Sequence, residues 1–184
     1  DRVCDIVICD GGSTDGSMKH DTLQLYHVNT LLTKTGPGKQ GAQLRMGIYF
    51  ALDRGYKGIL TIDATTRTRS RMCRNLSPSC RRASDLVAGS RLYPRRPCDQ
   101  HAAGALCRRA AGPCTARQLG AHQWFTDTTN AYRAYSREYL THPDVRPLRD
   151  VFGGYELLAY LSIRATQLGM KACEVPVTRA YPAT

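Results

Sequence analysis

Carboxylates and hydroxyls gather directly after two short apolar runs. The first run, residues 5–10, ends at Asp10 and continues as Gly11-Gly-Ser13-Thr-Asp15-Gly. Glycines allow a ligand close to the backbone, and carboxylate and hydroxyl oxygens can hold ribose hydroxyls or a base edge. The same residues are also common turn formers, so a surface turn with Asx-type hydrogen bonds is the alternative interpretation. This segment is therefore a candidate ligand-binding loop.

Asp63 ends the second apolar run, residues 58–63, and Arg91 ends a third, residues 85–91. A carboxylate at such a position can ligate a divalent cation that bridges a diphosphate, because Mg²⁺ binds through one or two carboxylates plus phosphate oxygens. A helix N-cap is the alternative role for Asp63. Arg91 suits phosphate recognition, although a surface ion pair is the alternative there.

A third candidate is the polar and aromatic run from Asp127 to Arg137. An aspartate among tyrosines, beside Arg133 and Arg137, could act as a base facing an acceptor while the two arginines neutralise phosphate. The alternative is a solvated helix start that Asp127 caps. The histidines show no metal-ligand spacing, and we interpret them as structural or surface residues.

Residues 36–41 match the pattern G-x-G-x-x-G, and Asp63 follows about 20 residues later, as in dinucleotide-binding folds. In such folds a strand leads straight into the first glycine, whereas residues 33–35 intervene here. Lys39 is followed by Gln40 rather than Ser or Thr, which also excludes a P-loop. We therefore regard the dinucleotide-binding interpretation as the weaker one.

The elements that must position these residues alternate along the chain. The three apolar runs are typical of buried strands, and residues 27–33 form a weaker strand candidate. Apolar spacing predicts helices over 43–54 and 155–168, with Gly55 and Gly169 just past their ends. A last strand over 170–178 contains Pro176, which favours a sheet edge. The pattern predicts an α/β fold with a mostly parallel sheet, in which ligands bind at the carboxyl ends of strands.

The formal charge of +11 suggests a polyanion-binding protein until its distribution is considered. Residues 67–117 hold 12 arginines and two acids, so that segment carries +10 and the rest of the chain only +1. A short helix is possible at 102–111. No apolar run reaches the roughly 18 residues of a membrane span, and no signal-peptide pattern occurs. The eight cysteines form no C-x-x-C pair, which gives a zinc site little support. Without a signal peptide, reduced thiols and a cytoplasmic location are expected.

Together the motifs resemble family-two inverting glycosyltransferases of the GT-A type, in the dolichyl- or polyprenyl-phosphate mannosyltransferase-like group. Residues 5–17 resemble the nucleotide-binding strand of that family, and 38–47 its Gly-Lys-Gly-Ala-Ala-Leu segment. Thr61-Ile-Asp63 falls at its metal-binding D-x-D motif, and 85–91 resembles the strand that brings an arginine to the donor phosphate. Residues 127–137, 155–164 and 174–179 are similar to its acceptor half.

The resemblance implies an inverting transfer from a nucleotide-sugar donor to a polyprenyl-phosphate or glycan acceptor. Asp127 and Arg133 would serve catalysis, with Asp63 holding Mg²⁺ or Mn²⁺. The donor-binding residues would be Asp10, Gly11, Ser13, Asp15, Lys39, Asp63 and Arg91. Peripheral contact with a membrane is expected, and binding to nucleic acid is not.

The resemblance also divides the chain and leaves alternatives open. Residues 1–66 form a nucleotide-binding half, 67–123 an irregular basic segment and 124–184 an acceptor-side half of a single domain. The family's first strand, ahead of Asp5, is expected to be absent. Thr65 stands where a second metal-motif residue belongs, so metal affinity should fall. A truncated or degenerate inactive transferase, or an arginine-rich module that binds nucleic acid or anionic lipid, are the alternatives.

Overall fold

The computed structural model describes residues 4–63, 84–90, 125–127 and 130–177. Contacts divide the chain into two compact units, Asp1–Tyr56 with Pro147–Leu157, and Lys57–Arg146 with Leu158–Thr184. Arg91, the expected helix over 102–111 and most of the basic segment 67–123 lie outside the described residues. Within the described ranges, no helix combines the length and the apolar character that crossing a bilayer requires.

The first unit is built on a parallel pair of strands. β1 (Val7–Asp10) pairs with β2 (Thr30–Thr33) in register, Val7 opposite Thr30 and Asp10 opposite Thr33. Both strands were predicted. A short helix, α1 (His20–Leu25), connects them and was not predicted. None of its six residues is buried, so it lacks the buried apolar face whose spacing predicts a helix.

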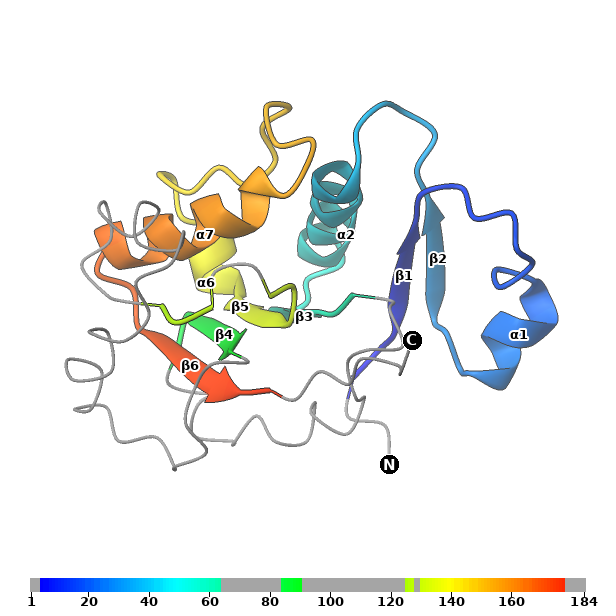
Figure 1. Ribbon diagram of the computed structural model, residues 1–184, viewed down its shortest axis with the longest axis horizontal. Coiled ribbons are helices and arrows are strands. Elements are labelled where there is room, and N and C mark those ends of the chain that lie inside the picture. The colour runs from blue at the N-terminus through cyan, green and yellow to red at the C-terminus, as the bar shows by residue number, and fades with distance from the viewer. Residues whose placement is uncertain (1–3, 64–83, 91–124, 128–129, 178–184) are drawn as a thin grey trace, which may run out of the picture. The chain divides into compact units, whose positions relative to one another are not determined.

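Helix α2 (Gln40–Asp53) follows β2 and lies beside β1 (Figure 1). Its buried residues include Ile48 and Ala51, and Gly55 just past its end has φ +77°. That left-handed conformation suits glycine, which lacks the Cβ that strains other residues there. The predicted helix and its cap are therefore confirmed, with a start three residues earlier than expected.

The second unit contains a mixed sheet. Its strands are β3 (Gly58–Thr61), β4 (Leu86–Ser90), β5 (Arg133–Ser136) and β6 (Ala172–Pro176). Their order is β3-β5-β4-β6, with β5 antiparallel to both neighbours and β4 parallel to β6. Among the described strands, the expected parallel arrangement is thus only partly observed. The difference arises at β5, a strand that the polar composition of residues 126–140 did not predict.

Burial within this sheet follows the order of its strands. β4 is an inner strand, and all five of its residues are buried. β6 is an edge strand of the described sheet, and Pro176 is its last residue, as the proline predicted. The core around the sheet contains Val87, Tyr132, Val175 and Val177.

Two helices pack on this sheet (Figure 1). α6 (Arg137–Leu140) begins after Ser136, whose Oγ accepts a hydrogen bond from the Tyr139 N–H. α7 (Glu156–Gln167) buries Leu158, Leu161 and Ala165 of its predicted apolar face, whereas Leu168, the fourth predicted residue, follows the helix and is only partly buried. The Tyr139 hydroxyl donates to the carbonyl of Leu161 at 2.5 Å and so joins the two helices. The predicted helix over 155–168 is confirmed, and Gly169 beyond it has φ +67°.

Gly41, in the first turn of α2, packs tightly against the backbone of residues 152–154. A Cβ at Gly41 would lie 2.4 Å from the Gly154 carbonyl oxygen and 2.8 Å from that of Phe152. Backbone atoms cannot rotate away as a side chain can. We expect Gly41→Ala to lower the free energy of unfolding by about 1–3 kcal/mol, because the strain exceeds the gain in helix propensity.

Urea denaturation followed by circular dichroism measures this change. Gly36→Ala is the matched control, since a Cβ at Gly36 meets no atom within 4 Å. Its stability should stay within about 0.5 kcal/mol of the parent protein. Equal stability of the two variants would contradict the close approach at Gly41.

Candidate active site

The loop after β1 is held by the side chain of Asp10. Its carboxylate accepts hydrogen bonds from the Gly12 N–H at 2.8 Å, the Ser13 N–H at 2.9 Å and the Ser13 hydroxyl at 2.6 Å. Hydrogen bonds hold the pKa of Asp10 below its ordinary value. The largest effect comes from the Ser13 hydroxyl, and the backbone N–H groups of Ser13 and Gly12 add to it. The Asx-type turn considered from the sequence is therefore present, and it gives the predicted ligand loop a defined shape.

Asp15 repeats this arrangement further along the loop. Its carboxylate accepts from the Ser17 N–H at 2.9 Å and from the Ser17 hydroxyl, and these bonds lower the pKa of Asp15. Gly11, Ser13 and Asp15 are all exposed. The buried Asp10 and the exposed Asp15 thus both order the loop through hydrogen bonds, while Gly11 and Ser13 remain exposed to a ligand.

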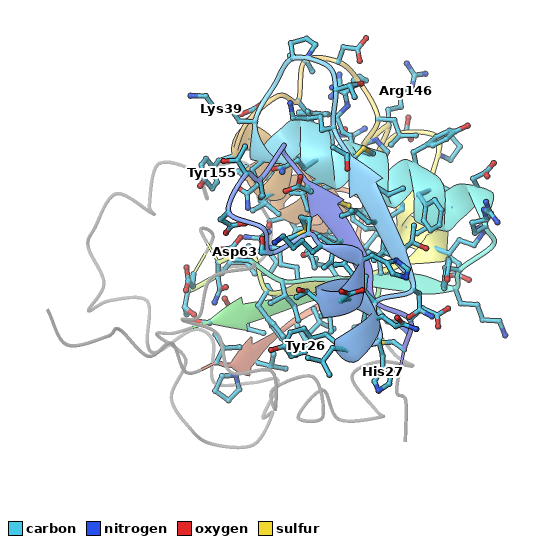
Figure 2. All side chains as sticks on the ribbon, turned by 90° about the vertical axis from the view of Figure 1, so that its right-hand side faces the viewer. Tyr26, His27, Lys39, Asp63, Arg146 and Tyr155 are labelled. Carbon is cyan, nitrogen blue, oxygen red and sulfur yellow. The ribbon has the colours of Figure 1, made fainter. Side chains whose placement is uncertain are left out.

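Helix α2 supports the loop through Gln43. The Gln43 side chain donates to the Cys9 carbonyl at 3.2 Å, and its Nε2 would lie only 2.7 Å from a Cβ at Gly11. Only glycine fits beside this amide without a shift. The Gln43 N–H donates to the carbonyl of Lys39, which directly precedes α2. Figure 2 shows the exposed Lys39 side chain extending away from the ribbon. The first unit therefore brings its five predicted donor-binding residues onto one loop and the adjoining helix start.

The second unit carries the remaining described candidates. Asp63 lies two residues beyond β3 and is half-buried (Figure 2). No cluster of three or more His, Cys, Asp or Glu side chains occurs in the part of the chain that the structure describes. β4 ends at Ser90, directly before Arg91.

Asp127 is buried, with 3% of its surface exposed. Its backbone N–H donates to Glu174 Oε1 at 3.3 Å. The next described element is β5, and the next described helix, α6, begins only at Arg137 with Ser136 as its cap. The helix-cap interpretation of Asp127 is therefore wrong, because residues 133–136 pair in the sheet rather than forming a helix.

Arg133 is fully buried within β5. Its Nε donates to the Asn130 carbonyl and its Nη1 to the Leu158 carbonyl, each at 2.8 Å, and Nη1 also contacts the Ser162 hydroxyl. In this arrangement the guanidinium joins the segment before β5 to α7. Contact between Arg133 and an acceptor phosphate stays a prediction, and the observed partners favour a supporting role.

The sequence placed Glu174 in a segment that resembles the acceptor half but gave it no role of its own; it lies in β6 and is 8% exposed. Its carboxylate accepts hydrogen bonds from the segment that contains Asp127. The available signal was an isolated acid in an otherwise apolar strand, Ala-Cys-Glu-Val-Pro. Buried acids are rare unless hydrogen-bonded, so such a residue predicts specific partners.

The first unit also contains an open groove of about 730 Å³ beside α2. Arg45 and Asp150, which both line it, form an ion pair. The lining residues are Pro37, Gly38, Ala42, Arg45, Met46, Tyr49, Leu148, Asp150 and Gly153. The groove mixes apolar side chains with one neutralised pair of charges.

The hydrogen bonds of Ser13 generate a prediction about Asp10. We expect Ser13→Ala to raise the pKa of Asp10, because the side-chain bond that lowers it most is removed. A carbon-13 NMR titration of the aspartate carboxyl groups measures this pKa. Since folding lowers the pKa of Asp10, its stabilisation is present above the unfolded-state pKa and is lost as the pH falls through the folded-state value.

Ser17→Ala is the matched control for this titration. Ser17 lowers the pKa of Asp15 more than any other group does, so this substitution should raise that pKa. The pKa of Asp10 should stay unchanged. An Asp10 titration that Ser13→Ala does not move would contradict the observed turn.

Comparisons with known proteins complete the description of the site. No family model matches the chain. An undecaprenyl-phosphate mannosyltransferase of Micrococcus luteus is 31% identical over 180 residues, which cover 95% of this chain and 71% of that protein. A polyprenol monophosphomannose synthase of Mycolicibacterium smegmatis is 29% identical over 185 residues, which cover 94% of this chain and 65% of that protein. The chain belongs to the family-two glycosyltransferases, in the group of polyprenyl-phosphate mannosyltransferases.

Proposed function

We propose that this chain transfers mannose from a nucleotide-sugar donor to a polyprenyl phosphate, with inversion at the anomeric carbon. The names of the two relatives supply the sugar and the class of acceptor. The observation that carries the proposal is the loop after β1, which Asp10 holds in a defined turn beside the start of α2. An ordered loop with open glycine positions at a strand's carboxyl end suits a nucleotide.

The donor would bind to the first unit through this loop and Lys39. Gly11 leaves its backbone open to the ligand, and Ser13 and Asp15 lie at the exposed side of the loop. The ammonium group of Lys39 would attract the donor's diphosphate. Because Asp10 and Asp15 already accept hydrogen bonds within the loop, their main contribution would be to keep its shape before the donor arrives.

Asp63 would hold a Mg²⁺ or Mn²⁺ ion together with the donor's diphosphate. One half-buried carboxylate, with no cluster of three metal-ligating side chains among the described residues, fits a cation that receives its other ligands from phosphate and water. When bound, the ion would stabilise the negative charge that develops on the departing diphosphate. Arg91 would contribute positive charge to the same group.

Asp127 would orient the acceptor, which is the second substrate. A phosphate oxygen of the acceptor attacks the anomeric carbon opposite the diphosphate, the bond from that carbon to the diphosphate oxygen breaks, and the configuration inverts. A phosphate acceptor is already anionic, so it needs position more than a base. Arg133 would support Asp127 by fixing the chain between Asn130 and α7. Because polyprenyl phosphates reside in membranes, we expect peripheral contact with a cytoplasmic membrane surface.

Donor binding tests the assignment of Asp63. Calorimetric titration with mannosyl, glucosyl and other UDP- and GDP-sugars should show tighter binding with Mn²⁺ than without it. Asp63→Asn should abolish that difference, and Lys39→Ala should weaken binding about tenfold under both conditions, because it removes one charge-assisted contact. Lys57→Ala, at an exposed lysine just before β3, is the control. A metal dependence that persists in Asp63→Asn would refute the assignment.

Glycosyl transfer tests Asp127 and the acceptor. We expect Asp127→Asn to lower kcat by about 100-fold while the Kd for the donor stays unchanged, since Asp127 would act on the acceptor. Transfer to a short-chain polyprenyl phosphate in detergent is measured, and proton NMR identifies the anomeric configuration. A product that retains the donor's configuration would exclude inversion, and transfer to glycans alone would exclude the lipid phosphate.

A further inference from the structure

Glu174 holds two consecutive residues of the segment before β5. Glu174 Oε1 accepts from the Thr126 N–H at 2.8 Å and from the Asp127 N–H at 3.3 Å. Glu174 Oε2 accepts from the Thr126 hydroxyl at 2.9 Å. Both oxygens of one carboxylate are therefore bound to a stretch of two residues, which restrains the position and the orientation of that stretch.

This arrangement places two acidic groups in a buried environment. Burial raises the pKa of Glu174, and the negative charge of Asp127 raises it further, while the hydrogen bonds from Thr126 and Asp127 oppose that rise. A buried carboxylate is unfavourable unless donors compensate it. An apolar residue would complete β6 without this desolvation, so the packing of the strand alone does not account for an acid here.

The same contacts reach the end of β4. The Ser90 and Thr126 hydroxyl oxygens lie 2.5 Å apart. Ser90 pairs with Pro176 in the parallel register of β4 and β6, and Ala88 pairs with Glu174. Thr126 therefore connects β6, the end of β4 and the segment that contains Asp127. All of these residues belong to the second unit.

We propose that Glu174 is a positioning residue for glycosyl transfer, whose carboxylate fixes Thr126 and Asp127 so that the Asp127 side chain is held in place for the acceptor. The inference rests on the proposed function of Asp127. It adds a role for β6, an edge strand that carries none of the residues expected to touch the substrates. A reacting group must keep its position closely, because displacement by about 1 Å can cost about 100-fold in rate.

Substitutions in the full chain test this role by steady-state transfer. Glu174→Ala should lower kcat by about 10- to 100-fold, with the Kd for the donor changed less than about twofold. Glu174→Gln should recover part of the rate, because its amide oxygen can still accept from the two backbone N–H groups. Thr126→Val keeps its N–H but loses the hydroxyl, so its kcat should lie between those of Glu174→Ala and the parent protein. Thr126→Ser keeps both groups and should have the kcat of the parent protein.

Glu138→Ala is the control, since Glu138 is an exposed acid on α6 and its removal changes the net charge equally. It should leave kcat unchanged. Amide hydrogen exchange supplies a readout that does not depend on activity. The Thr126 and Asp127 amides should exchange faster in Glu174→Ala than in the parent or in Glu138→Ala, while amides of β1 should not change. Donor titration counts the folded, binding-competent protein in each preparation.

The outcomes separate the inference from the proposed function. The positioning role would be overturned if Glu174→Ala had the same kcat as the parent protein, calculated per donor-binding molecule. It would also be overturned if the amide exchange rates of Thr126 and Asp127 were unchanged in that variant. A lower rate explained entirely by fewer donor-binding molecules would overturn it too, because it would indicate a stability effect. If the parent protein transfers no sugar to polyprenyl phosphate, the proposed function fails, and the exchange result alone then decides whether Glu174 fixes the segment.

Discussion

The pairing of β5 with both β3 and β4 is the constraint on which the second unit depends. It brings residues that are far apart in sequence into one sheet, with Leu60 opposite Ala134 and Val87 opposite Ala134 on the other side. Residue 133 thereby lies inside the sheet, where its guanidinium reaches α7. Without β5, β4 would lose one of its two neighbours among the described strands.

The two units use buried or partly buried carboxylates in different ways. In the first unit, Asp10 accepts bonds from residues within its own loop, so the loop is ordered by local interactions. In the second unit, Glu174 accepts bonds from residues 47 and 48 positions away in the sequence. Local bonds need little tertiary support, whereas the Glu174 bonds join two segments that only the tertiary fold brings together. In the function that we propose, the first arrangement would order the loop that binds the donor, and the second would position the residue that faces the acceptor.

Much of the fold followed from periodicity. Helices α2 and α7, the strands that end at Asp10 and Thr61, and the glycines that follow each helix were all predicted, because apolar spacing and glycine conformation are local properties. β5 was not, since its sequence Arg-Ala-Tyr-Ser shows no alternation of apolar and polar residues, and its burial depends on its neighbours in the sheet. The short helix α1 buries nothing and left no signal.

The sequence by itself determined the strand-end residues that could carry chemistry and the family that they resemble, because the motifs lie in short, contiguous stretches. Only the tertiary structure decided what some of those side chains do. It buried Arg133 among backbone carbonyls, removed the helix-cap role of Asp127 and joined Glu174 to Thr126. The physical reason is that hydrogen bonds between distant strands depend on register and burial, which no local pattern of residues encodes.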